Sequence, residues 1–197
     1  MSDLRKVFAT LGASNHTTGE RAENDYYATH PQAVDYLLKN FDIPKTTKIW
    51  ECACGEGHLS KRLTELGYNV YSTDIINRNF GEEMNFFDFS EKLDDNILIL
   101  TNPPYQLAME FVLHALELLS ENSYCIMFLK LTFLEGQKRF SELFRHHPPK
   151  TVLVFSKRMK CARNGIFKAG EDDNSAVAYC WYIWKKGFKG KPVIEWI

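Results

Sequence analysis

The residues best equipped for chemistry are Asn102, Pro103, Pro104 and Tyr105, which directly follow the apolar run 97–101. An unbroken apolar run rich in β-branched residues is typical of a strand buried on both faces of a sheet. Two prolines end such a strand because they lack an N–H and fix φ, and the residue before a proline is held extended. The amide, the carbonyl oxygens and the ring are therefore mounted rigidly at a strand's carboxyl end, where open parallel sheets bind ligands.

This tetrapeptide offers hydrogen-bond acceptors and a stacking surface, but no nucleophile, metal ligand or strong base. A proline-rich turn that merely ends the strand is the competing interpretation. From average residue usage, the tetrapeptide is expected by chance in about one in a thousand chains of this length. Its position directly after a buried strand therefore favours a functional site.

Residues 48–74 have the order of a nucleotide-binding unit: a strand, a glycine turn, a helix and a second strand that ends at Asp74. Gly55 and Gly57 in the turn allow the backbone to approach a ligand at the helix N-terminus. Asp74, about twenty residues further on, is placed to accept hydrogen bonds from a ribose diol. A tight turn followed by a surface aspartate is the alternative, and the complete order of elements disfavours it.

The chemistry of the glycine turn distinguishes between nucleotide cofactors. The turn lacks the third glycine that packs against a dinucleotide pyrophosphate, and Glu51 and Glu56 place carboxylates where a diphosphate would be repelled. S-adenosylmethionine, with an ammonium, a sulfonium, a ribose diol and an adenine, matches this chemistry better than NAD. A hydride-transferring enzyme is therefore disfavoured.

Residues 85–89 are expected to form a short strand that leads into a loop. Asp88 could accept a hydrogen bond from the exocyclic amine of the cofactor adenine, while Phe89 packs on its ring. A core strand that ends in an aspartate is the alternative, and the residues alone leave both interpretations open.

The composition is that of an ordinary globular protein of 197 residues, with 45% hydrophobic and 25% charged residues. We expect one domain over 1–197, with an N-terminal arm at 1–24 and a long mobile loop at 157–175. The five cysteines are odd in number and include no C-x-x-C pair, which favours free thiols in a reducing compartment. Since no secretory segment and no membrane-spanning run is present, we expect a cytoplasmic protein.

The net charge of −1 conceals an asymmetry along the chain. Residues 125–197 contain 14 Lys and Arg against 6 Asp and Glu, whereas residues 1–124 contain 10 against 19. A basic C-terminal third indicates a polyanionic partner such as a nucleic acid. An ordinary solvated surface is the alternative explanation.

Together, these motifs resemble those of the DNA adenine-N6 methyltransferases that have an Asn-Pro-Pro-Tyr catalytic loop. The similarity runs from Asp25 to the end of the chain, and the catalytic loop matches without departure. The arm at 12–16 and the segment 155–196 look like small adenine methylases common in bacteriophages and prophages. The cofactor motifs precede the catalytic motif, which is the gamma order of the family.

The resemblance implies roles for individual residues. It implies cofactor contacts from Tyr27, Thr29, Pro31, Glu51, Ala53, Cys54, Gly55, Gly57, Asp74, Ile75, Asp88, Phe89 and Asn102. In the catalytic loop of Asn102, Pro103, Pro104 and Tyr105, the Asn102 side chain and the Pro103 carbonyl would hold the two hydrogens of the adenine amine, and Tyr105 would stack on an extrahelical adenine. It implies DNA phosphate contacts from Lys157, Arg158, Lys160, Arg163 and Lys168, with Phe167 as a second stacking ring.

The implied fold is a single Rossmann-like class I methyltransferase domain with helices on both faces of a mostly parallel seven-stranded sheet, whose last strand is antiparallel. The implied cofactor is S-adenosylmethionine, no metal is expected, and the implied partner is double-stranded DNA in a restriction-modification or phage setting. The sequence departs from larger members in having no separate target-recognition domain. DNA selectivity would then come from loops, chiefly 157–175, or from a partner subunit or a second copy of the chain.

Two rival functions remain open at this point. The same loop could methylate another planar amine, such as a protein glutamine or an RNA base. Alternatively, the chain could be a non-catalytic subunit that binds cofactor or DNA in a modification complex. The intact Asn-Pro-Pro-Tyr loop disfavours the second of these.

Overall fold

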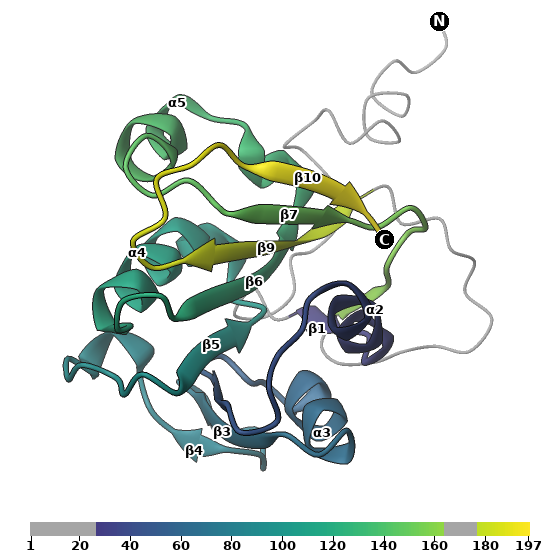
Figure 1. The fold of residues 1–197 in the computed structure, drawn as a ribbon. Coiled ribbons are helices and arrows are strands. Elements are labelled where there is room, and N and C mark those ends of the chain that lie inside the picture. The colour runs from purple at the N-terminus through teal and green to yellow at the C-terminus, as the bar shows by residue number, and fades with distance from the viewer. Residues whose placement is uncertain (1–26, 164–176) are drawn as a thin grey trace, which may run out of the picture.

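The computed structural model describes residues 27–163 and 177–197, and these form a central sheet with helices on both faces (Figure 1). In this part of the chain, the main sheet has eight strands in the order β10-β7-β9-β6-β5-β2-β3-β4. The strands are β2 (Lys48–Glu51), β3 (Asn69–Asp74), β4 (Glu82–Glu83), β5 (Ile97–Thr101), β6 (Tyr124–Lys130), β7 (Thr151–Val154), β9 (Tyr179–Lys185) and β10 (Val193–Trp196). All neighbours are parallel except β9, which runs antiparallel to both β6 and β7.

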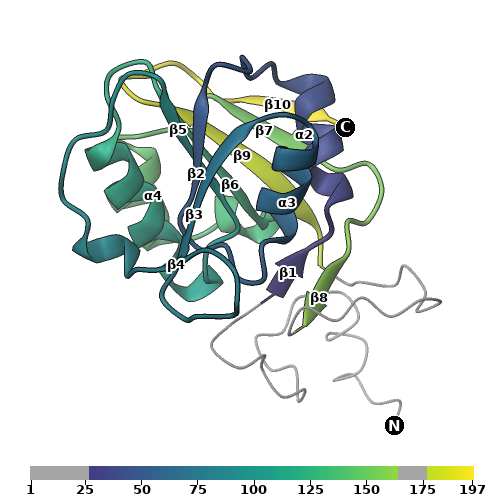
Figure 2. The same cartoon turned by 90° about the horizontal axis from the view of Figure 1, so that it is seen from below.

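Two apolar layers hold helices against the sheet, one on each face (Figure 2). The α-helices are α2 (Gln32–Asn40), α3 (His58–Glu65), α4 (Ala108–Leu118) and the short α5 (Gln137–Arg139), which continues as the π-helical turn η5 (Phe140–Phe144). Helices α2 and α3 pack on one face, where the Trp181 indole N–H also donates to the Ala33 carbonyl of α2 (2.9 Å). Helix α4 packs on the other face through Phe111 and Val112. None of the described helices is long and apolar enough to cross a bilayer.

A small second sheet lies at the edge of the carboxyl ends of the main strands. Strand β1 (Tyr27–Thr29) pairs antiparallel with β8 (Cys161–Arg163), so that Tyr27 lies opposite Arg163 and Thr29 opposite Cys161. Residues 157–175 are predicted to form a loop, whereas the structure places strand β8 within them. Residues 164–175 of this segment lie outside the described residues, as does the arm at 1–24.

The predicted fold class is confirmed, but the elements differ in two places. Strand β10 adds an eighth strand, and it runs parallel to β7, so the antiparallel strand is β9 and not the last one. All four β10 residues are exposed, so the alternation of apolar and polar residues that indicates a strand is absent there. The strand expected over 85–89 is instead the 3₁₀ turn η2 (Phe86–Asp88), because the Asn85 side chain accepts from the Phe87 N–H (3.2 Å) and caps the turn.

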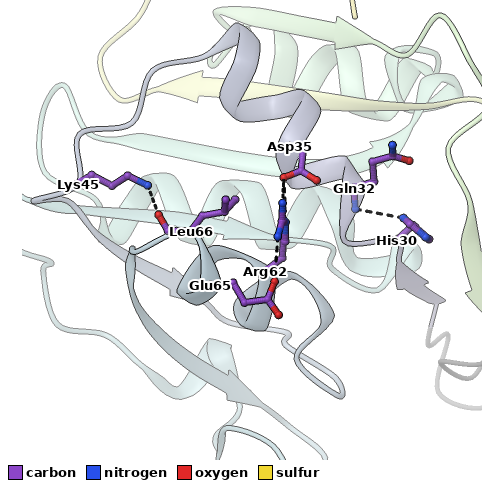
Figure 3. Close-up of polar contacts among 7 residues, drawn as sticks. All are labelled: His30, Gln32, Asp35, Lys45, Arg62, Glu65 and Leu66. Carbon is purple, nitrogen blue, oxygen red and sulfur yellow. Dashed lines mark hydrogen bonds and ion pairs between the residues drawn. The ribbon is translucent and has the colours of Figure 1, made fainter.

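Helix α2 is tied to α3 by a single guanidinium group (Figure 3). Arg62 of α3 donates to Asp35 of α2 (2.7 Å) and to Glu65 of its own helix (3.1 Å). Next to this pair, His30 Nδ1 accepts from the Gln32 N–H (3.2 Å) at the start of α2. Arg62 and Asp35 are half-buried, and their contact adds to the packing of the fully buried α2 residues Val34 and Leu37.

Candidate active site

A cavity of about 670 Å³ opens at the carboxyl ends of β2, β3 and β5, and β1 forms one of its walls. This volume is in the range of small-molecule sites. The predicted cofactor and catalytic residues that line it are Tyr27, Thr29, Glu51, Ala53, Cys54, Asp74, Ile75, Asn102, Pro103, Pro104 and Tyr105. The structure therefore brings the predicted catalytic loop and most of the predicted cofactor residues to one cavity.

Five predicted cofactor residues do not line this cavity, namely Pro31, Gly55, Gly57, Asp88 and Phe89. The two glycines act through their backbone in the turn before α3, and Pro31 precedes α2. Asp88 is exposed and accepts from the Asn85 side chain (3.0 Å), while Phe89 packs edge-on against Trp50. The 3₁₀ turn η2 directs this pair away from the cavity, and Phe86 and Phe87 line the wall instead.

The carboxylate of Asp74 is anchored by three donors. Its Oδ2 accepts from the Gly55 N–H (2.8 Å), and its Oδ1 accepts from the Ile76 N–H and from Arg78 Nη1 (both 2.9 Å). A carboxylate has about four acceptor positions, so one remains for a ligand hydroxyl while Arg78 stays in place. Arg78 also lines the cavity and was missed by the sequence analysis, although it stands four residues after the predicted acid.

Glu51 is a buried acid that faces the same cavity. The Ser60 hydroxyl donates to its Oε2, and the Ser60 and Ser72 hydroxyl oxygens are 2.6 Å apart. Burial raises the pKa of Glu51 to about 8, and the nearby Asp74 charge acts in the same direction. A cation in the cavity would favour the ionised carboxylate, so the chemistry of this wall suits a positively charged ligand.

We predict that Glu51 makes the ligand-free protein less stable as the pH rises. The unfolded carboxyl titrates near its ordinary pKa, whereas the folded one keeps its proton to about pH 8, so the folded state holds an extra proton between those values. The free energy of unfolding should fall by on the order of 3 kcal/mol from this group between about pH 5 and about pH 7.5. Thermal melts of Glu51→Gln should therefore show a flatter pH dependence.

The matched control for this measurement is Glu56→Gln, which removes a partly exposed carboxylate from the same turn. Its melting temperatures should follow the slope of the wild type. If Glu51→Gln also keeps that slope, the buried carboxyl does not carry the pH dependence.

The side-chain amide of Asn102 is held from one side only. Its Nδ2 donates to the Tyr27 carbonyl (2.7 Å) and to Thr29 Oγ1 (2.8 Å). The Tyr27 carbonyl can only accept, so it determines which end of the amide faces β1. Asn102 Oδ1 is buried and has no hydrogen-bond partner among the described residues. A buried acceptor without a partner is costly in a folded protein, which makes this atom the best candidate for a ligand contact.

The ring of Tyr105 lies among other rings and a cation. It stacks on Tyr27 (centroids 5.7 Å apart, 25° between planes) and is tilted against Tyr179 (6.1 Å). Lys130 Nζ lies 4.7 Å from the centroid of the Tyr105 ring. Burial raises the pKa of the Tyr105 phenol well above its ordinary value, so Tyr105 offers an aromatic surface and no base.

Three of the predicted phosphate-binding residues, Lys157, Arg158 and Lys160, do not line the cavity. Lys157, Arg158 and Lys160 are exposed on the segment that leads into β8, and the Lys160 carbonyl accepts from the His30 N–H (3.2 Å). Arg163 is described through its backbone pairing with β1. Phe167 and Lys168 lie outside the described residues.

The cysteines are free thiols, as predicted. Cys54 lines the cavity, but burial raises its pKa to about 12, which disfavours a role as a nucleophile. Within residues 27–163 and 177–197, no three His, Cys, Asp or Glu side chains are grouped so that they could hold a metal ion.

Comparison with known proteins adds three similarities. The chain is 24% identical over 171 residues to a Mycoplasma pneumoniae protein described as an uncharacterized adenine-specific methylase, with 77% of this chain and 38% of that protein covered. The chain therefore spans well under half the length of this relative. No family model matches the chain.

Solved structures show the fold. A protein from Listeria monocytogenes described as a class I S-adenosylmethionine-dependent methyltransferase superposes with a TM-score of 0.57 at 9% identity, over 98% of this chain and 71% of that one. A modification subunit assigned to a type I restriction enzyme of Vibrio vulnificus superposes with a TM-score of 0.58 at 14% identity, over 98% and 49%. The chain has the class I methyltransferase fold.

The cavity of this methyltransferase fold fits the chemistry of S-adenosylmethionine. Asp74 retains one acceptor position for a ribose hydroxyl, Glu51 suits a cationic group, and Phe86 and Phe87 present an aromatic wall for a base. A Cβ on Gly57 would lie 2.2 Å from the Phe80 ring, and the backbone there has φ +78, so both the ring and the backbone favour glycine at this position. The acceptor groups, the aromatic wall and the cavity volume agree with a nucleoside that carries a positive charge.

Proposed function

We propose that this chain transfers a methyl group from S-adenosylmethionine to the exocyclic N6 amine of adenine in DNA. The observation that carries the proposal concerns Asn102, which lines the cavity and whose buried Oδ1 has no hydrogen-bond partner among the described residues. An N–H of a ligand amine could donate to this acceptor. The description of the Mycoplasma pneumoniae relative as an adenine-specific methylase supports the choice of adenine.

Residues of β2, β3 and the turn between them would hold the cofactor. Asp74 would accept from a ribose hydroxyl, and Glu51 would lie toward the ammonium end. When bound, S-adenosylmethionine supplies an electrophilic methyl group on its sulfonium. The anchoring of Asp74 by the Gly55 N–H fixes the turn and the acid relative to each other, which orients a ligand held by both.

The target amine is a poor nucleophile because its lone pair is delocalised into the adenine ring. Acceptance of its two hydrogens by Asn102 Oδ1 and the Pro103 carbonyl would favour a pyramidal nitrogen with a localised lone pair. No base has to remove a proton before attack, and neither Tyr105 nor Cys54 is suited to do so, since burial raises the pKa of both side chains. The rate of methyl transfer would be increased by the positioning of the amine and by electrostatic stabilisation of the transition state.

The base would leave the duplex stack and enter beside Tyr105. One ring, Tyr27, already stacks on Tyr105, so an entering adenine either takes the place of Tyr27 or uses another part of the ring surface. Tyr27 belongs to β1, whose partner strand β8 follows the basic segment 157–160. The entry path of the base and the basic segment are thus adjacent, which supports a nucleic acid as substrate.

We predict that Lys157 and Lys160 contact DNA phosphates. The double substitution Lys157→Ala/Lys160→Ala should weaken DNA binding on all sequences and reduce the slope of log K against log salt by about 2, because each lysine displaces about one counterion. The control Lys189→Ala/Lys191→Ala makes the same charge change beside β10 and should keep the wild-type slope. Equal slopes in both double variants would remove the basic segment from the DNA interface.

The function itself is tested with purified protein, methyl-labelled S-adenosylmethionine and unmethylated genomic DNA. Label should appear in DNA, and a nucleoside digest should contain N6-methyladenine. Parallel reactions with RNA and with protein extracts separate the rival amines. Label confined to RNA or protein, or normal cofactor binding with no transfer to DNA, would contradict the proposal.

A further inference from the structure

The orientation of the Asn102 amide depends on two acceptors of different kinds, both on β1. One is the Tyr27 carbonyl, which belongs to the backbone, and the other is the hydroxyl oxygen of Thr29. These contacts use both N–H groups of the amide and leave Oδ1 as its free end. Thr29 is 2% exposed, so its hydroxyl has little access to solvent.

The hydroxyl of Thr29 keeps its own proton, because its oxygen accepts from Asn102. The Cys161 thiol, whose Sγ is 3.9 Å from the Tyr105 hydroxyl oxygen, is on the facing strand. Thr29 and Cys161 lie opposite each other in the β1–β8 pairing, which keeps the two side chains in register.

We infer that Thr29 is a positioning residue, whose hydroxyl holds the Asn102 amide so that Oδ1 faces the cavity and the target amine. This inference rests on the proposed function. The resemblance implies a cofactor contact for Thr29, whereas the structure shows its oxygen bonded to the catalytic loop. Without that acceptor, one buried N–H of Asn102 loses its partner and turns toward the space where the amine has to donate.

The test compares Thr29→Val, which replaces the hydroxyl by a methyl group of similar size, with Thr29→Ser, which keeps it. In Thr29→Val, kcat for methyl transfer should fall about tenfold while the Kd for S-adenosylmethionine stays unchanged, because one hydrogen bond to the amide is lost. Thr29→Ser should restore kcat to within about threefold of the wild type. If Thr29→Val unfolds, the same comparison is made between Thr29→Ala and Thr29→Ser.

A second readout does not depend on activity. The Asn102 side-chain amide gives two proton signals in a ¹⁵N-correlated NMR spectrum, and their absence from Asn102→Ala identifies them. Thr29→Val should shift one of them upfield and speed its exchange, and Thr29→Ser should not. This shift with no methyl transfer by the wild type would mean that the proposed function fails while the positioning contact stands.

Three results would overturn the inference. One is an unchanged kcat in Thr29→Val. Another is a Kd for cofactor that rises by the same factor as kcat falls, which would make Thr29 a cofactor contact. The last is a Thr29→Ser variant as impaired as Thr29→Val, which would make the methyl group and not the hydroxyl responsible.

Discussion

Asn102→Ala should lower kcat for methyl transfer by about 100-fold or more, the size of effect seen when one hydrogen-bonding group aimed at a transition state is removed. The substitution removes the buried Oδ1 acceptor and leaves the Tyr27 carbonyl and the Thr29 hydroxyl without their donor. Cofactor affinity should be kept, because Asp74 and Glu51 lie on other strands. Single-turnover transfer and calorimetric cofactor binding measure the two effects separately.

The matched control is Asn69→Ala, which removes an exposed amide at the opposite end of β3 from the cavity. It should leave both kcat and cofactor affinity at wild-type values. Undiminished transfer by Asn102→Ala would remove Asn102 from the reaction. A loss of cofactor affinity equal to the loss of rate would instead assign Asn102 to the cofactor alone.

Gly57→Ala should damage cofactor binding and folding together. Gly57 precedes α3 at φ +78, and a Cβ there would lie 2.2 to 2.5 Å from three atoms of the Phe80 ring. The left-handed backbone and the overpacked ring should together cost about 3 kcal/mol of unfolding free energy. A displacement of the turn that carries Cys54 and His58 should weaken cofactor binding by about tenfold or more.

Gly67→Ala separates the steric part of this effect from the backbone part. Gly67 has nearly the same backbone angle, φ +83, but a Cβ there would meet nothing within 4 Å. Its cost should be about 1 kcal/mol with no change in cofactor affinity. Denaturant unfolding and cofactor titration of both variants make the comparison, and equal behaviour of the two would show that contact with Phe80 is not what restricts the turn.

The sequence alone is sufficient for the fold class and for the edge of the sheet that carries the cavity. The apolar run 97–101 can only be buried, and the prolines after it have to end the strand, so local chemistry determines where Asn102 lies. Two further features are also determined locally. The turn depends on the backbone freedom of its glycines, and the position of Asp74 depends on the length of the strand that it ends. The structure contains the strand, the glycine turn and the acid at the predicted positions, because each is determined by residues close in the sequence.

The weakest sequence predictions concern segments without a periodic pattern. The segment 85–89 is predicted to be a short strand, but an asparagine cap makes it a 3₁₀ turn, and Asp88 and Phe89 do not line the cavity. Strand β10 is exposed along its whole length and forms by pairing with β7. The 3₁₀ turn depends on one capping side chain, and β10 depends on a partner strand about forty residues away. Neither cause produces a periodic residue pattern.

What only the tertiary structure decided is how the side-chain amide of Asn102 is held. The pairing of β1 with β8 joins residues more than 130 positions apart, and it brings Tyr27 and Thr29 against Asn102, which is more than 70 positions away from them. Residue types specified an acceptor at the end of a strand, whereas its direction is set by donors and acceptors that only the folded chain assembles.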